Sequence, residues 1–105
     1  MPEKATLAQL EMAQAVVYDY LKPTPEICWP LLSQRCGCEV WVKHENHTPT
    51  GAFKVRGGLN YLNDLCNNNT PVSGIISATR GNHGQSLAFA CAQKGVPLTI
   101  IVPNG

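Results

Sequence analysis

Several features that would assign a protein quickly to a class are absent from this sequence. Its 105 residues carry a net charge of only +1 and contain no run of basic residues, so no overall field attracts nucleic acid or an anionic membrane. No apolar stretch approaches the roughly 20 residues of a membrane span, and the N-terminus has no apolar signal segment. We therefore expect a cytoplasmic protein, or an organellar one if a transit peptide has been lost, with no nucleic-acid or membrane partner.

The five cysteines lack a metal-binding pattern. Cys36-Gly37-Cys38 is the only close pair, whereas zinc sites use Cys-x-x-Cys pairs matched by a second pair or by histidines. We expect no metal site, and thiols that are reduced and mostly structural. A Walker pattern and a Gly-x-Gly-x-x-Gly motif are also missing, so nucleotide binding has little support.

What is present is the balance of a small globular domain, with 44% hydrophobic and 14% charged residues. Thr6 and Gln9 resemble a capping box, and glycines at 37 and 95 stand where helices would end. Apolar periodicity and these signals predict helices at about 7–19, 30–35, 52–65 and 82–93.

Three segments read as strands. Residues 39–44 alternate polar and apolar side chains, and residues 72–78 and 98–102 are apolar enough to be buried strands. Strand, helix and strand in this order predict a parallel βαβ unit, so the fold class is α/β. Parallel sheets need helices on both faces, and the sequence stops directly after the last strand. We therefore interpret the chain as incomplete.

The first candidate for chemistry is Lys54, in the run Thr48-Pro-Thr-Gly-Ala-Phe-Lys-Val-Arg-Gly-Gly58. A lysine that attacks an aldehyde must be neutral, and both the positive end of a helix and partial burial favour the neutral amine. Phe53 beside it offers an apolar wall to a flat ring. Gly57 and Gly58 each cost a helix about 1 kcal/mol, which suggests close approach of a ligand or another backbone. The alternative is a surface lysine before a glycine-weakened helix.

The second candidate is the turn Ser77-Ala-Thr-Arg-Gly-Asn-His-Gly-Gln-Ser86. It joins the carboxyl end of a predicted parallel strand to a helix N-terminus, where open α/β sheets bind ligands and backbone N–H groups favour anions. The polar side chains of this turn, which suit a carboxylate or a phenolic oxygen, are those of Thr79, Asn82, His83 and Gln85. The alternative is an ordinary turn in which Asn82 is the N-cap.

In this order and at this separation, the two segments resemble the fold-type II pyridoxal-phosphate enzymes, specifically the threonine/serine dehydratase and serine racemase branch. The resemblance runs from about Thr6 to Val102. It implies a partial tryptophan synthase β-like fold. Residues 1–70 would begin the large cofactor domain, including the Schiff-base lysine, and residues 71–105 would start the small α/β domain.

The resemblance also implies roles. The cofactor would be pyridoxal 5′-phosphate, and the enzyme would convert a small β-hydroxy amino acid to a 2-oxo acid and ammonia. Lys54 would form the internal aldimine and later take the α-proton, Phe53 would pack on the pyridine ring, and Asn82 would hydrogen-bond the cofactor's 3′-oxygen. The substrate carboxylate would be surrounded by Thr79, Gly81, Asn82 and His83.

Arg80 departs from the pattern of the branch. Racemases of this kind place a serine there, so racemization is disfavoured. Cysteine synthase-like relatives tend to have threonine where His83 stands and Lys-Asp-Arg in place of Lys-Val-Arg at Lys54, so the sequence disfavours them as well. Arg80 would either select an acidic β-substituent, as in a hydroxyaspartate, or point to solvent.

The family's glycine-rich phosphate loop, the residue facing the pyridine nitrogen and its cation site would lie beyond Gly105, because such an enzyme needs on the order of 300 residues. We therefore expect this chain alone to bind cofactor weakly and to be inactive, and the full-length form to be a homo-oligomer. Two alternatives stay open: a non-catalytic remnant or subunit-docking fragment, and a small anion-binding α/β domain.

Overall fold

The structure is a computed structural model that describes residues 3–105. Short connections join its helices and strands. In chain order these are α1 (Leu7–Tyr18), β1 (Glu26–Cys28), α2 (Pro30–Cys36), β2 (Trp41–Lys43), the 3-10 turn η1 (Glu45–His47), α3 (Lys54–Asn67), β3 (Ile75–Ala78), α4 (Asn82–Lys94) and β4 (Leu98–Ile101).

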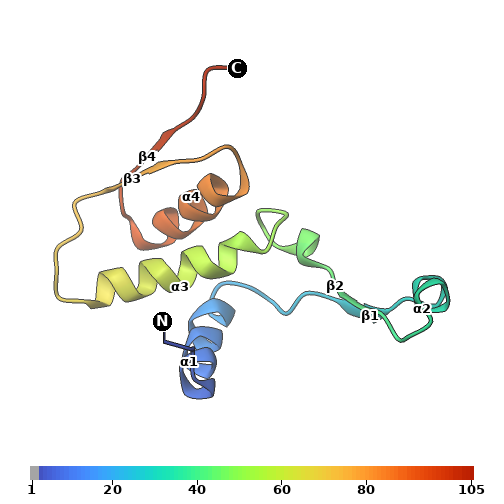
Figure 1. Cartoon of the computed structure of the whole chain (residues 1–105). Coiled ribbons are helices and arrows are strands. Elements are labelled where there is room, and N and C mark those ends of the chain that lie inside the picture. The colour runs from blue at the N-terminus through green and yellow to red at the C-terminus, as the bar shows by residue number, and fades with distance from the viewer. Residues whose placement is uncertain (1–2) are drawn as a thin grey trace.

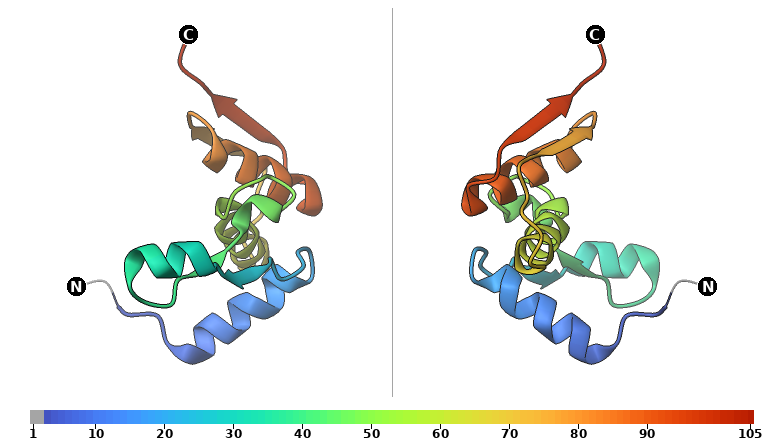
Figure 2. Two further views of the ribbon diagram at one scale, coloured as in Figure 1. Left: turned by 90° about the vertical axis from the view of Figure 1, so that its right-hand side faces the viewer. Right: turned by 90° about the vertical axis from the view of Figure 1, so that its left-hand side faces the viewer.

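Helix α3 lies at the centre of the molecule. Figure 1 shows α1 on one side of α3 and α4 on the other, and the two side views in Figure 2 show the same order. Strands β3 and β4 lie beyond α4. Residues 26–43, which comprise β1, α2 and β2, extend away from these helices, and we call them the arm.

The predicted helix ends are confirmed by cap geometry. The Thr6 hydroxyl accepts a hydrogen bond from the Gln9 N–H at 3.2 Å, and the Gln9 side chain accepts one from the Thr6 N–H at 2.8 Å, which completes the capping box. Gly37 and Gly95 end α2 and α4 with φ angles of 69° and 65°, a conformation that L side chains rarely adopt.

The parallel βαβ unit is also confirmed. Strands β3 and β4 pair in parallel, from Ile75 opposite Leu98 to Ala78 opposite Ile101, and α4 connects them. A second pairing was not predicted: β1 runs antiparallel to β2, with Ile27 opposite Val42. A strand of three residues is too short to show a reliable alternation, which is why the sequence did not reveal β1.

The prediction that residues 72–78 and 98–102 form buried strands is wrong in two respects. Both strands are shorter than expected, and only alternate residues on them are covered. Ile75, Leu98 and Ile100 pack against the helical core, whereas Ile76 and Ile101 on the other face are 73% and 57% exposed. The second face is exposed because the helical core of residues 3–105 packs against one face of the strand pair only, and side chains of a strand alternate between its two faces.

One core joins the N-terminal and C-terminal parts of the chain. Val55, Leu59 and Leu62 of α3 are at most 1% exposed, and each such burial contributes about 1.5–3 kcal/mol. They pack with the face of α4 that periodicity predicted, formed by Leu87, Ala90 and Cys91, and with Val17 and Leu21. Burial raises the pKa of the Cys91 thiol. In the described part of the chain, no helix is long and apolar enough to cross a bilayer.

Helices α3 and α4 approach each other closely at Gly58. A Cβ on Gly58 would lie 2.2 Å from Ser86 Oγ and 3.0 Å from the Ser86 carbonyl oxygen, so only glycine permits this approach. Ser86 is 1% exposed, and its hydroxyl donates to the Lys54 carbonyl at 2.7 Å. The expected close approach of another backbone is thus confirmed for Gly58. At Gly57 nothing lies within 4 Å of the corresponding Cβ position.

The segment before α3 is tied to the helix by Glu45. Its carboxylate accepts hydrogen bonds from Arg56 Nε at 2.7 Å and Arg56 Nη2 at 3.0 Å, and a third from the Thr24 hydroxyl. The Arg56 guanidinium also lies over the Tyr18 ring, 5.7 Å from its centroid. The ion pair therefore joins η1 to α3, and the further contacts of its two side chains link the connection after α1 through Thr24 and α1 itself through Tyr18.

Replacing Gly58 and Gly57 separately tests the helix contact. Gly58→Ala should destabilise the chain by about 1–3 kcal/mol, because the new methyl group forces α3 and α4 apart. Gly57→Ala, the matched control one residue earlier, should instead be neutral or stabilising by up to about 1 kcal/mol, because it only improves helix propensity. Urea unfolding followed by circular dichroism measures both, and equal effects would contradict the close contact.

Glu45→Gln should remove a pH-dependent part of the stability. The hydrogen bonds from Arg56 hold the pKa of the Glu45 carboxyl below its ordinary 4.5, against the opposing effect of burial and with a further contribution from Thr24. A depressed folded-state pKa stabilises the fold above about pH 4.5, and this contribution disappears as pH falls through the folded-state value.

Wild type should therefore exceed Glu45→Gln by roughly 1 kcal/mol near neutral pH, and the difference should shrink below about pH 4.5. Urea unfolding at a series of pH values measures this. Glu39→Gln, an exposed carboxyl on the arm, controls for net charge and should track wild type. A difference that stayed constant with pH would contradict the role of the ion pair.

Candidate active site

Lys54 is the first residue of α3, as the sequence predicted for its first turn. The loop before it is held by Thr48, whose buried hydroxyl accepts from the Ala52 N–H at 3.0 Å and donates to the Ala52 carbonyl at 2.8 Å. Gly51, at a φ of 69°, allows the turn. These bonds engage both backbone groups of Ala52, so the helix begins at Lys54 and not at the expected position 52.

The Lys54 side chain is exposed and not partly buried. Its ammonium lies 5.4 Å from the centroid of the Phe53 ring, which is itself 60% exposed. A flat ligand could therefore reach both side chains. The Lys54 backbone is fixed more firmly than its side chain, because its carbonyl accepts the hydrogen bond from buried Ser86.

Thr79 organises the turn between β3 and α4. Its hydroxyl oxygen accepts from the Gly81 N–H at 3.2 Å and from the Gly84 N–H at 3.1 Å. Gly84 packs directly on Thr79, since a Cβ at Gly84 would lie 2.5 Å from Thr79 Cγ2. Thr79 therefore does the work of a capping residue from two positions before the N-cap.

The interpretation of Asn82 as the N-cap is wrong. Gly81 occupies the N-cap position, and Asn82 is the first residue of α4. The reason is that the Thr79 hydroxyl already supplies an acceptor to the first turn of the helix. Asn82 and His83 come before the first intrahelical donor, Gln85, and so lie at the positive end of the helix dipole.

Lys54 and His83, which are 29 positions apart in the sequence, line the same cavity of about 380 Å³. One wall comes from a single face of α3 at helical spacing, and the other comes from β3 and α4. The complete lining is Lys54, Gly57, Gly58, Tyr61, Ile75, Ile76, Ser77, His83 and Leu87. Tyr61 and Ser77 were not predicted as site residues, although Tyr61 is seven residues after Lys54 and thus shares its helix face.

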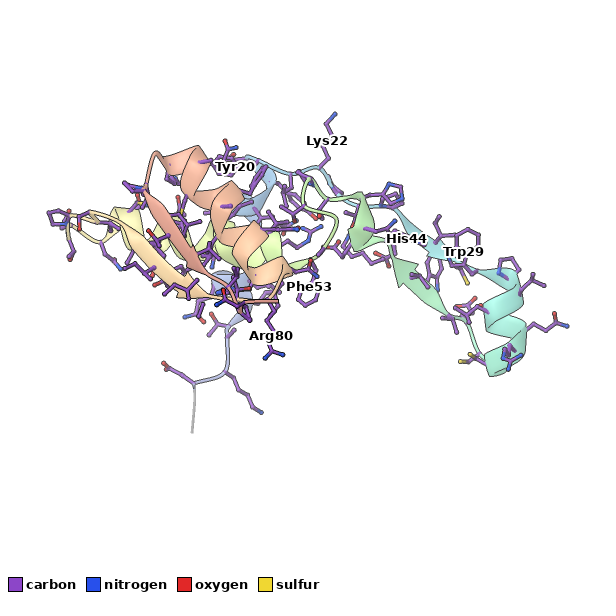
Figure 3. The ribbon with its side chains drawn as sticks, turned by 90° about the horizontal axis from the view of Figure 1, so that it is seen from above. Tyr20, Lys22, Trp29, His44, Phe53 and Arg80 are labelled. Atoms are coloured by element: carbon purple, nitrogen blue, oxygen red, sulfur yellow. The ribbon has the colours of Figure 1, made fainter. Side chains whose placement is uncertain are left out.

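The other predicted site residues do not line this cavity. Phe53 precedes Lys54 at the start of α3, and Gly81 and Asn82 belong to the first turn of α4. Thr79 lines a separate cavity of about 360 Å³ with Arg80, at the carboxyl ends of β3 and β4. Figure 3 shows the Arg80 side chain projecting outward from the turn, and it is exposed.

The cavity suits an aldehyde-bearing aromatic cofactor in size and in chemistry. Its volume falls within the roughly 300–1,000 Å³ of small-molecule sites, and its walls combine apolar side chains with a few polar groups. Lys54 supplies a primary amine, Gly57 leaves the helix surface open beside it, and His83 faces the same space. By contrast, no group of three or more histidine, cysteine or acidic side chains in residues 3–105 is placed to hold a metal ion.

Comparison with known proteins gives one consistent result. Residues 17–105 match the family model described as pyridoxal-phosphate dependent enzyme. The chain is 33% identical over 101 residues to serine racemase of Bos taurus, covering 94% of this chain and 30% of the relative. It is 35% identical over 96 residues to the biosynthetic L-threonine dehydratase of Corynebacterium glutamicum, covering 91% of this chain and 22% of the relative.

A third relative is the L-threo-3-hydroxyaspartate ammonia-lyase of Saccharomyces cerevisiae, which is 33% identical over 88 residues, or 84% of this chain and 27% of the relative.

Solved structures agree on the fold. A pyridoxal 5′-phosphate-dependent aspartate racemase superposes with a TM-score of 0.87 at 28% identity, over 99% of this chain and 34% of that one. Maize serine racemase superposes with a TM-score of 0.85 at 28% identity, over 96% of this chain and 31% of that one. The chain thus spans about a third or less of these proteins, as a partial fold-type II architecture. It belongs to the family of pyridoxal-phosphate dependent enzymes.

Proposed function

We propose that this chain carries the lysine side of the active site of a threonine/serine dehydratase, which converts a small β-hydroxy amino acid to a 2-oxo acid and ammonia. The observation that carries the proposal is the placement of Lys54 and His83 on one cavity. The hydrogen bond from Ser86 to the Lys54 carbonyl supports it, since it ties the two segments together.

In this proposal the cofactor, when bound, supplies an electron sink for the bonds at the substrate α-carbon. Lys54 Nζ would be the amine that holds the cofactor through its aldehyde, and the same amine, when free, would accept the α-proton. Phe53, the neighbour of Lys54, would cover one face of the ring, and Asn82, the neighbour of His83, would donate to the ring oxygen, with both residues lying next to the cavity and not in its lining. The substrate carboxylate binds at the N-terminus of α4, close to Gly81, Asn82 and His83.

We propose two roles for Thr79 in substrate binding, one structural and one by direct contact. Because its oxygen accepts two backbone N–H groups, it holds the carboxylate-binding turn in shape, and its hydroxyl proton is available to an anion. We further propose that residues 1–70 and 71–105 belong to two domains of the family architecture, with the Ser86 contact at their boundary.

The isolated chain should bind the cofactor weakly and should not turn over. Lys54 and His83 line the cavity, but its lining contains no glycine-rich loop whose backbone N–H groups could bind a phosphate. The two glycines in the lining, Gly57 and Gly58, belong to helix α3. The alternatives of a subunit-docking segment or a remnant share this expectation. A subunit-docking segment would in addition bind a full-length dehydratase subunit.

A second candidate is a hydroxyaspartate dehydratase. Arg80 favours it, because an exposed guanidinium next to Thr79 is suited to a second carboxylate on the substrate. Two of the matched proteins, an L-threo-3-hydroxyaspartate ammonia-lyase and an aspartate racemase, are named for dicarboxylic substrates. Arg80 also stands where the racemases of this branch carry their second acid/base serine, which favours elimination over racemization.

The assignment of Lys54 can be tested by covalent trapping. After incubation with pyridoxal 5′-phosphate and reduction with borohydride, peptide mapping of wild type should find the label mainly on Lys54, because this amine lines the cavity that we propose for the ring. Lys54→Ala should lose the site-specific label.

Lys22→Ala is the matched control, because Lys22 is an exposed lysine that lines a different cavity and points to solvent (Figure 3). It should leave labelling of Lys54 unchanged. A uniform distribution of label over the lysines, unaltered by Lys54→Ala, would disprove the proposed role.

A further inference from the structure

Two exposed cysteines lie together on the arm, remote from the cavity that Lys54 lines. Cys36 is the last residue of α2 and Cys38 follows it after Gly37. Figure 1 places α2 at the outer end of the arm, away from α3 and α4. The other cysteines have different surroundings: Cys91 is buried, Cys28 is half-buried, and Cys66 is exposed on α3 without a cysteine next to it in sequence.

The backbone between Cys36 and Cys38 forms a tight turn at the carbonyl group of Ser33. Gly37 adopts a φ of 69° and a ψ of 20°, and both its N–H and the Cys38 N–H, at 3.3 Å, donate to the Ser33 carbonyl. Consecutive Cα atoms are about 3.8 Å apart, so Cα atoms two positions apart are at most about 7 Å apart and come closer in a curled segment. A disulfide usually spans about 4.4–6.8 Å between Cα atoms, so the pair is within reach.

Ser33 holds the turn from its other side as well. Its hydroxyl accepts a hydrogen bond from the Val40 N–H at 2.9 Å, and the same oxygen lies 3.6 Å from Cys28 Sγ. The backbone from 36 to 40 is thus attached at three points to a single residue of α2. This attachment limits how far the two exposed thiols can separate, which lowers the entropy that closing a bond between them would cost.

From this geometry we propose that Cys36 and Cys38 form a reversible dithiol–disulfide pair, a redox modification site that reacts with small-molecule disulfides. A ring closed across one intervening residue departs from relaxed disulfide geometry, and strained, exposed disulfides are easily reduced again. The pair is therefore suited to reversible exchange and not to permanent cross-linking.

The small disulfide is the oxidant in this reaction. One protein thiolate attacks it, forms a mixed disulfide and releases one small thiol. The second protein thiolate then attacks the protein sulfur of the mixed disulfide and releases the second small thiol. Overall the protein loses two electrons and two protons, and the small disulfide is reduced to two thiols.

The pairing can be tested by equilibrating the full chain in buffers of reduced and oxidised glutathione, quenching with acid, alkylating and mapping peptides by mass spectrometry. Wild type should contain a Cys36–Cys38 disulfide without bound glutathione. Cys38→Ser should instead accumulate glutathione on Cys36, and Cys66→Ser should leave the disulfide unaffected. Glutathione on both Cys36 and Cys38 of wild type, or pairing of either with Cys28, would overturn the proposal.

Two substitutions at Gly37 test the contribution of the turn itself. Gly37→Asn keeps a residue that tolerates positive φ, whereas Gly37→Val is strained there and should open the turn. The Val variant should lower the equilibrium constant for disulfide formation about tenfold relative to the Asn variant. Equal constants for the two variants would show that the turn does not hold the thiols together.

Discussion

The close approach of α3 and α4 at Gly58 and Ser86 sets the distance between the two walls of the cavity. Because a Cβ at Gly58 would meet Ser86, the helices can approach this closely only with glycine at that position. The Ser86 hydroxyl then bonds the Lys54 carbonyl and fixes the start of α3 against α4. This contact also aligns the buried faces of the two helices, so the core and the site depend on the same pair of residues.

The turn after β3 shows how one residue can serve stability and binding together. The Thr79 oxygen supports the Gly81 and Gly84 N–H groups, so the first turn of α4 keeps its shape without a side-chain cap from Gly81. A preorganised helix N-terminus binds an anion without first having to become ordered. The proposed carboxylate site at Asn82 and His83 therefore depends on a threonine that does not line the Lys54 cavity.

The arm is held to the rest of the molecule by polar contacts. Its antiparallel strands are followed by η1, where Glu45 pairs with Arg56 on α3. Beyond this ion pair the arm is held by local hydrogen bonds, such as those to Ser33 and the one from the Trp29 indole N–H to His44 Nε2 at 2.9 Å (Figure 3). The separation of the arm from the cavity allows a redox change at Cys36 and Cys38 without direct contact with the proposed catalytic residues.

Much of this arrangement follows from the sequence by itself. The capping box at Thr6, the helix ends at Gly37 and Gly95, the parallel βαβ unit and the position of Lys54 in the first turn of α3 depend on local preferences, and all are as predicted. Which faces of β3 and β4 are covered, the pairing of β1 with β2, the capping role of Thr79 and the placement of Lys54 and His83 on one cavity were decided only by the tertiary structure. These features depend on contacts between residues far apart in the chain or on side-chain geometry, and neither periodicity nor capping signals carry information about such distances.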